Sequence, residues 1–375
     1  MLGDIKHLYS TVVDSKHKWK IISIIPEFPE NFTACFLSHS EGDTLEIAFT
    51  KKSLLRLFKS SHSYWHEQVL SKDMDFEELA RTAENSLLWD LYYMTLGYLI
   101  TTNENHTLIR LHEVVVYELY SREGDIFIEK EFEIITTFLS SRFKRINKSS
   151  SLWFWTKKLT IILILQRFVE GKDVRAFHEC LVDRTFKSCQ FHFANYYACN
   201  FLRWYLAMLA IVEDTERVRS IEDQVLTSCH QNFRDVSLWG LLETLITRGS
   251  KSLEFMALHY NTIVRSLPTK DGRSYPEFAA TDKQAAEPYN INIEHEISWL
   301  LSADCSFRTP YVSLLRPFEP NGNREVWRRI ESLLVTKLED ESEQLARFED
   351  HSSEHYRKKK ELYETLDYVI EEYFE

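Results

Sequence analysis

Two histidines and two cysteines in the middle of the chain are of the residue types that bind metals. His178 and Cys180 come first, Cys189 follows after eight intervening residues, and His192 lies three positions beyond Cys189. Structural zinc sites use cysteine and histidine, but they place each pair of ligands at a short, regular spacing. Because the spacing here is unusual for such a site, we expect buried thiols and ordinary surface histidines, and no metal site.

The chain contains none of the short motifs that mark common catalytic sites. HExxH, the P-loop, GxSxG and the dinucleotide-binding fingerprint are all absent from its 375 residues. Its six cysteines are irregularly spaced and include no CxxC pair, which is too sparse for a disulfide scaffold. We therefore expect a reduced protein that has no activity alone and carries no cofactor.

The apolar runs of the sequence are short. Residues 1–20 are polar and charged, unlike a signal peptide. The most apolar run, residues 159–165, is far shorter than the roughly 20 residues that span a membrane. These features predict a cytoplasmic location and no membrane span.

Acidic residues outnumber basic ones by 57 to 45, giving a net charge of −12. Residues 339–375 hold 13 acidic and 5 basic side chains, so most of the excess lies near the C-terminal end. Proteins that bind nucleic acid through its phosphates normally carry the opposite charge. We expect no nucleic-acid partner, and we interpret the basic run 357–360 as one face of a solvated helix.

Proline and apolar periodicity predict a mainly helical chain. No proline occurs between Pro29 and Pro268, and proline is strongly disfavoured inside helices. The exception is near the N-terminus, where residues 20–25, 33–38 and 44–49 have the composition of short strands. The predicted fold class is therefore all-α with a small N-terminal β element.

Five segments share a pattern typical of helix starts. Each opens with a residue that caps helices well, and most place a large apolar residue four positions later, on one helical face. Successive starts lie 46, 44, 40 and 88 residues apart, the last being twice 44. With the amphipathic stretches between them, they predict helical hairpins of about 40–46 residues stacked as a right-handed α-α superhelix, rather than 34-residue tetratricopeptide repeats. The five starts are Asn105, Ser151, Asn195, Asp235 and Asn323.

We expect three parts in the chain. Residues 1–50 form a helix and the β element, and residues 51–335 form the helical array, interrupted by an exposed loop at 268–290. Residues 336–375 form an acidic C-terminal helix.

Residues 195–204 resemble the repeat motif N-Y-x-x-W-x-x-R-x-W of the α subunits of protein prenyltransferases. Three of the motif's five positions match: Asn195, Tyr196 and Trp204. In other copies, Trp155, Lys158, Trp239 and Trp327 hold the Trp or Arg positions. The N-terminal β element and residues 102–107 are similar to a divergent branch, the α subunit of type III protein geranylgeranyltransferase, in what looks like a fungal member.

This resemblance implies a non-catalytic subunit of helical hairpins that wraps a Rab-type geranylgeranyltransferase β subunit. The zinc and the isoprenoid pocket would belong to that β subunit. The substrate would be a trafficking protein whose C-terminal cysteine is geranylgeranylated. Tyr196, Tyr197 and Lys148 would be the candidate contacts to the diphosphate. The repeat core would consist of Asn105, Trp155, Lys158, Asn195, Trp204, Trp239 and Trp327.

Two alternatives remain open at the level of sequence. Tyr196 and Tyr197 are also of the type that packs as wedges between hairpins. The whole chain also fits a helical adaptor that has no transferase activity and affects secretion or cell-wall organisation indirectly. The missing motif Arg in four of the five copies favours the adaptor, and the N-terminal resemblance favours the transferase subunit.

Overall fold

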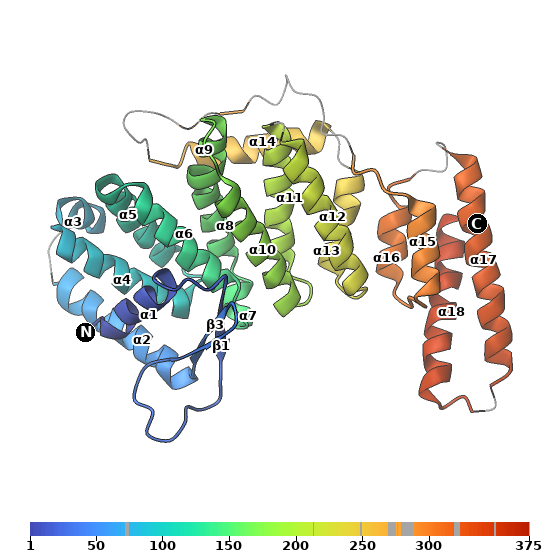
Figure 1. Cartoon of the computed structure of the whole chain (residues 1–375), viewed down its shortest axis with the longest axis horizontal. Coiled ribbons are helices and arrows are strands. Elements are labelled where there is room, and N and C mark those ends of the chain that lie inside the picture. The colour runs from blue at the N-terminus through green and yellow to red at the C-terminus, as the bar shows by residue number, and fades with distance from the viewer. Residues whose placement is uncertain are drawn as a thin grey trace. The chain divides into compact units, whose positions relative to one another are not determined.

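The computed structural model describes residues 1–71, 75–212, 214–247, 250–268, 275, 277–278, 288–318, 323–348 and 350–374. This part of the chain is mostly helical with one small N-terminal sheet, as predicted (Figure 1). It divides into two compact units. Unit 1 comprises residues 1–202 and 258–278, and unit 2 comprises residues 203–257 and 279–375. The boundaries of these units differ from the predicted ones near residues 50 and 335.

The sheet belongs to unit 1 and has the strand order β1-β3-β2, with β1 at Trp19–Ile24, β2 at Leu37–Glu41 and β3 at Thr44–Phe49. β1 pairs with β3 in parallel, and β2 pairs with β3 in antiparallel fashion. β2 lies later than the predicted 33–38. The reason is the tight turn, in which Glu41 pairs with Thr44 and Gly42 adopts φ +53°, so the register is fixed by the residues next to the turn.

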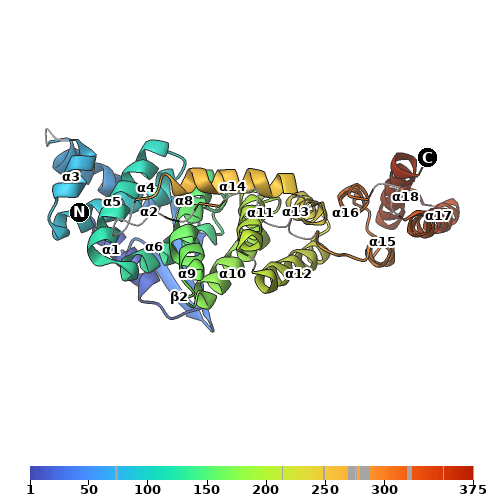
Figure 2. The ribbon, with the colours of Figure 1, turned by 90° about the horizontal axis from the view of Figure 1, so that it is seen from above.

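The helices of unit 1 pack against the sheet, where α6 contacts β1, and continue beyond it. α4 packs on α5, α5 on α6, and α6 on α8 and α10, while α1 contacts both α4 and α6 (Figure 2). Two five-residue π-helical segments, Trp65–Val69 and Ile161–Leu165, extend α2 and α8. The helices of unit 1 are α1 (Gly3–Val13), α2 (Lys51–Tyr64), α3 (Phe76–Thr82), α4 (Asn85–Thr102), α5 (His106–Glu123), α6 (Asp125–Leu139), α7 (Lys144–Asn147), α8 (Ser150–Thr160), α9 (Gln166–Val169), α10 (Arg175–Phe191) and the beginning of α11 (Tyr196–Ile211).

All the regular secondary structure in the described residues of unit 2 is helical. α12 packs on α13, and α17 packs on α18, which lie next to each other in Figure 1. Its helices are the remainder of α11, α12 (Thr215–Gln231), α13 (Val236–Ile246), the beginning of α14 (Ser250–Val264), α15 (Ile293–Ser302), α16 (Arg308–Leu315), α17 (Arg324–Ala346) and α18 (Glu354–Tyr373).

The C-terminal segment 336–375 contains the end of one helix and the whole of another. α17 begins at Arg324 and continues past residue 336, and α18 starts after Ser353, whose hydroxyl accepts from the Tyr356 amide at 3.1 Å. One face of α18 is buried, and it carries the apolar residues Leu362, Leu366, Val369 and Ile370. Most of the predicted loop 268–290 lies outside the described residues.

Helix starts agree well with the capping signals. Asn105, Asp235 and Asn323 each cap a helix by accepting an amide hydrogen bond in the first turn. Asn195 Oδ1 accepts from the Ala198 amide at 3.4 Å. The fifth start is displaced, because the hydroxyl of Ser149, two residues before Ser151, caps α8.

Three of the four motif tryptophans are fully buried, as predicted: Trp155 in unit 1, and Trp204 and Trp239 in unit 2. The fourth, Trp327, is half-buried, with its ring centre 5.1 Å from that of Phe374. Among the described helices, none is long and apolar enough to cross a membrane.

Candidate functional site

Tyr196 and Tyr197 lie where α10 gives way to α11 in unit 1. Their exposed fractions are 59% and 38%, and that of Phe193, which sequence reasoning missed, is 50%. The rings of the two tyrosines contact edge to face, with centres 5.7 Å apart. Three large aromatic side chains therefore reach solvent within five residues, which is not the environment of a packing wedge. We call Phe193, Tyr196, Tyr197 and the adjacent Lys148 the aromatic corner.

Lys148 holds the backbone of this turn. Its ammonium group donates to the carbonyl oxygens of Phe193 and Ala194, at 2.6 and 2.9 Å. Ala194 adopts φ +51°, a left-handed conformation that is costly for a residue with a side chain. The lysine compensates part of that cost by satisfying two carbonyls at the point where the chain reverses.

Two buried asparagines fix the corner from below. Asn195 Nδ2 donates to Asn147 Oδ1 at 2.6 Å and to Ser188 Oγ at 3.0 Å. Asn147 Nδ2 donates to the carbonyls of Leu139 and Ser141, at 2.9 and 3.1 Å. Both asparagine side chains are fully buried. The ends of α6 and α10 and the start of α11 are thus tied through α7, so the aromatic side chains stand on a rigid base.

Basic side chains lie on α7, just before it and near the end of α10, the segments that flank the aromatic corner. The guanidinium of Arg142 lies 4.5 Å from the centre of the Phe191 ring, and the Lys187 ammonium lies 5.1 Å from it on the same helix end. Lys144 and Arg145 are exposed on α7. The corner therefore combines apolar rings with a local excess of positive charge.

The pKa of His192, which is next to Phe193, responds to that charge. Burial lowers this pKa, and the positive charges of Lys148 and Lys144 lower it further, against hydrogen bonds from the backbone that raise it. A carboxylate, Glu104, lies beside the start of α8, where it accepts from the hydroxyls of Ser149 and Ser150. Glu104 therefore already accepts two hydrogen bonds.

The four residues with metal-ligand chemistry are not assembled into a site. Cys189 Sγ lies 4.0 Å from Cys199 Sγ, and burial raises the pKa of Cys180. The expectation of a surface histidine is wrong for His178, which is buried in α10. Within the ranges that the structure describes, no group of three His, Cys, Asp or Glu side chains is placed to hold a metal ion.

Unit 1 also contains a buried carboxylate that the sequence did not indicate. Glu131 is fully buried and accepts from the Tyr92 hydroxyl at 2.7 Å, from His112 Nε2 at 2.9 Å and from Trp155 Nε1 at 2.8 Å. Burial acts to raise the pKa of Glu131, but the charge and hydrogen bond of His112 and the other two donors lower it overall. The repeat-core residue Trp155 therefore has a polar role in addition to its packing. Lys158 likewise pairs with Glu113, at 2.7 Å.

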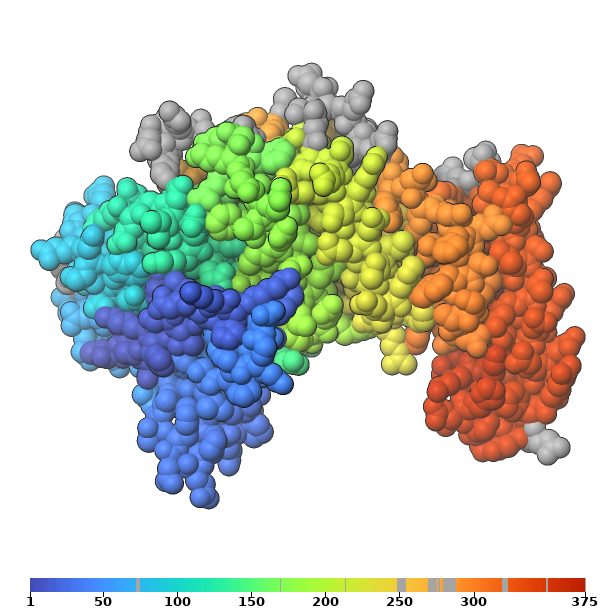
Figure 3. Space-filling model, in the orientation of Figure 1, coloured from blue at the N-terminus to red at the C-terminus, as the bar shows by residue number. Residues whose placement is uncertain are grey.

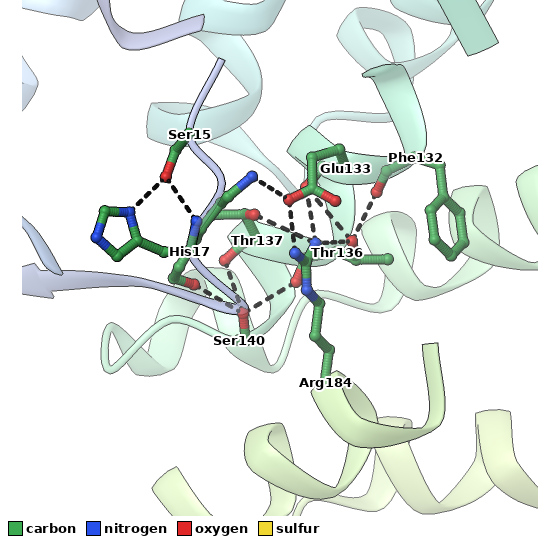
Figure 4. Close-up of polar contacts among 9 residues, drawn as sticks. Ser15, His17, Phe132, Glu133, Thr136, Thr137, Ser140 and Arg184 are labelled. Atoms are coloured by element: carbon green, nitrogen blue, oxygen red, sulfur yellow. Dashed lines mark hydrogen bonds and ion pairs between the residues drawn. The ribbon is translucent and has the colours of Figure 1, made fainter. Parts of the chain in front are cut away.

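A second buried cluster joins the sheet to the helices (Figure 4). Glu133 Oε1 of α6 pairs with Lys20 of β1 and with Arg184 of α10, each at 2.6 Å. Arg184 reaches between Glu133 and Thr136, and donates to the Thr136 hydroxyl at 2.6 Å. Burial acts to raise the pKa of Glu133, but Arg184 and Lys20 lower it overall. We call this the Glu133 cluster, and its many mutual contacts give it a structural role.

Comparison with known proteins gives a family different from the expected one. Residues 2–140 match the family model of the ECM9 N-terminal domain, and residues 152–267 match that of the ECM9 middle domain. The chain is 27% identical over 293 residues to Protein ECM9 of Saccharomyces cerevisiae (strain ATCC 204508 / S288c), an alignment that covers 76% of this chain and 70% of that protein. No solved structure matches the chain.

The resemblance to protein prenyltransferase α subunits, including the type III branch, is therefore wrong. It rested on helix-capping residues and buried tryptophans, which helical hairpins of any family need. The matches to the ECM9 models cover most of the motif copies, including Asn105, Trp155, Trp204 and Trp239. The implied Rab-type β subunit, its zinc, the geranylgeranylated substrate and the diphosphate contacts of Tyr196, Tyr197 and Lys148 lose their basis with it.

Proposed function

We propose that this chain is a helical adaptor that uses the aromatic corner to bind an acidic, partly apolar segment of a partner protein. The observation that carries this proposal is the exposure of Phe193, Tyr196 and Tyr197 on a rigid base. Exposed apolar patches on soluble proteins mark interaction sites when they are contiguous. Tyrosine is enriched among the residues that dominate binding energy.

Rigidity supports the proposal. Binding costs free energy when side chains or loops must become ordered. Here the turn is held in advance by Lys148, and the helix ends beneath it by Asn147 and Asn195. A partner would therefore meet a surface that needs little rearrangement.

Charge determines which kind of partner is proposed. Four basic residues lie on the segments that flank the corner, although the whole chain carries a net charge of −12: Arg142, Lys144, Arg145 and Lys187. An acidic segment is attracted to such a local positive potential and oriented by it. Single-stranded nucleic acid also stacks on aromatic side chains, but it carries a charge on every nucleotide, so the net charge of −12 opposes it more strongly than a short segment with a few acidic residues.

We also infer that the helical pairs continue as a right-handed α-α superhelix, the scaffold that would present the corner. The packing of α4 on α5, α6 on α8 and α12 on α13 agrees with the predicted pairing of each amphipathic helix with the motif helix after it. Small-angle scattering that fits a compact globule would contradict this inference. A cytoplasmic location remains a prediction, which imaging of the tagged protein would check.

The adaptor proposal is tested by fluorescence anisotropy with three labelled probes. They are a short peptide of alternating acidic and Leu or Phe residues, the same peptide with Asn and Gln in place of the acids, and a single-stranded oligonucleotide. We expect the full chain to bind the acidic peptide at least about tenfold more tightly than either other probe. Equal affinity for the amide peptide, or preference for the oligonucleotide, would overturn the proposal.

A matched pair of variants links the binding to the corner. Y196A/Y197A should weaken binding of the acidic peptide, whereas L70A/F255A, which removes two other exposed apolar side chains, should leave it unchanged. Equal losses in both variants would show nonspecific apolar binding and would contradict the assignment.

A further inference from the structure

A cavity of about 860 Å³ lies in unit 1, between the connection from β1 to β2 and the first turns of α2. Its residues belong to the N-terminal part of the chain, blue in the space-filling view (Figure 3). The cavity is separate from the aromatic corner and shares no residue with it. Its volume lies in the range of about 300–1,000 Å³ that is typical of small-molecule sites.

One wall of the cavity is apolar. Ile24, Ile25 and Pro26 continue from the end of β1, and Phe28 and Phe32 follow in the connection. The two phenylalanine rings pack against each other, with centres 4.7 Å apart and planes tilted by 51°. Both side chains are only half-buried, so part of each ring remains available to a ligand.

The other wall is basic. Lys51 and Lys52 occupy the first turn of α2, are exposed, and form no ion pair within the part of the chain that the structure describes. Positive side chains in the first turn are unfavourable, because the helix dipole is positive there. The first turn has no acidic residue to offset them. Among the described residues, neither an ion pair nor the helix dipole stabilises these lysines, so their charge is available to an anionic ligand.

Other groups of the basic wall are already occupied. Thr50 and Ser53 cap α2 reciprocally, at 2.8 and 3.1 Å, so the charge offered to a ligand is that of the lysine side chains rather than the helix amides. Arg56 pairs with Asp4 at 2.7 Å and donates to the Thr33 carbonyl, which fixes the rim.

The remaining charged or ionisable groups that line the cavity leave its sign positive. Burial raises the pKa of Cys35 to about 12, and its thiol donates to the Ser53 carbonyl, so this residue stays neutral. Glu27 is the single carboxylate among the lining residues, against Lys51, Lys52 and Arg56.

We propose that this cavity binds an amphiphilic anion. The apolar part of the ligand, an acyl chain or ring, would lie against Ile25, Phe28 and Phe32. The phosphate or carboxylate head group would lie between Lys51 and Lys52. The negative head group would also offset the unfavourable positive charge of the two lysines at the start of α2. Ligand binding would therefore stabilise the folded chain.

The experiment is calorimetric titration of the full chain with dodecyl phosphate, laurate, dodecanol and inorganic phosphate, each kept below its aggregation concentration. We expect dodecyl phosphate and laurate to bind, and the two probes that lack either the charge or the chain to bind at least about tenfold more weakly. A large preference between phosphate and carboxylate identifies the natural head group. Binding by dodecanol as tight as by dodecyl phosphate would overturn the anionic part of the proposal.

Variants locate the site. K51Q/K52Q should weaken dodecyl phosphate binding about tenfold and leave dodecanol binding unchanged. K16Q/K130Q removes the same charge elsewhere in unit 1 and should have no effect. F28A/F32A should weaken the binding of both dodecyl phosphate and dodecanol. Since Lys51 and Lys52 are exposed, their variant is expected to fold and decides the question by itself: unchanged affinity for dodecyl phosphate refutes the site.

Discussion

The aromatic corner and the Glu133 cluster both bring charged groups together in unit 1, but they differ in what remains available. In the Glu133 cluster, Lys20, Arg184 and the carboxylate of Glu133 are buried or nearly so and bind one another. At the corner, Lys148 secures the backbone while the three rings project into solvent. We infer from this contrast that partnered, mostly buried charges stabilise the fold, and we propose that exposed aromatic rings on a rigid base serve binding.

The largest effect should come from opening the Glu133 cluster. Arg184→Ala leaves the mostly buried Glu133 with only Lys20 as an ionic partner, so the free energy of unfolding should fall by about 3 kcal/mol, the lower end of the range for breaking a buried pair. Lys172→Ala, which breaks the exposed pair with Glu170 at 2.7 Å, should change it by less than about 1 kcal/mol. Urea unfolding of both variants measures the difference. Similar small values for the two would show that burial of the cluster contributes little.

Removing the two tyrosine rings from the aromatic corner should have the opposite effect, a loss of binding without a loss of stability. Y196A/Y197A should weaken binding of the acidic peptide by about 2 kcal/mol, or about 30-fold, while the free energy of unfolding stays within about 0.5 kcal/mol of the parent. Fluorescence anisotropy measures the loss of binding, and urea unfolding of the same preparation measures the free energy of unfolding. A loss of stability as large as the loss of binding would place these tyrosines in the fold, and the comparison between the two regions would fail.

The pH dependence of stability provides a further, smaller test of the Glu133 cluster. The pKa of Glu133 is lower in the folded chain than its unfolded value of about 4.3. The unfolded chain then binds more protons as the pH drops, so the stability due to Glu133 is complete above about pH 4.3 and is lost as the pH falls through the folded pKa.

Glu133→Gln removes this titration, so its unfolding free energy should depend less steeply on pH below about 4.3 than that of the parent. Urea unfolding from neutral to acidic pH measures both slopes, and the other carboxylates cancel in the comparison. Parallel slopes would mean that Glu133 titrates normally in the folded chain.

Local signals in the sequence predicted much of the framework, and long-range pairing explains most of what they missed. Capping by Asn105, Asp235 and Asn323 depends on residues within one helical turn, so the local sequence is enough to predict it. The Lys20–Glu133 pair joins residues 113 positions apart, and nothing near either residue indicates the other. The parallel pairing of β1 with β3 is missed for the same reason.

The sequence singled out Tyr196, Tyr197 and Lys148, but the diphosphate contacts assigned to them rested on the resemblance that the comparisons contradict. Tyr196 and Tyr197 stood out as aromatic residues at a helix start, yet sequence alone does not distinguish a wedge from an exposed ring. Their exposure depends on the turn at Ala194, whose positive φ is stabilised by Lys148 from another element. The resemblance to prenyltransferases is wrong for a related reason: the residues on which it rested are common to helical hairpins of many families.

The smallest expected effect separates ring from hydroxyl at the corner. Y196F/Y197F keeps both aromatic surfaces and removes only two hydroxyl groups that water already solvates in the free chain. If the rings anchor an apolar part of the partner, affinity for the acidic peptide should change by about twofold or less. If the hydroxyls donate to the partner's carboxylates, each such bond contributes about 1.5–3 kcal/mol, and the double variant should lose at least about tenfold. Titration of the amide peptide provides the control, since it offers no carboxylates. A large loss confined to the acidic peptide would replace apolar anchoring by polar recognition, with the basic residues around the corner supplying only long-range attraction.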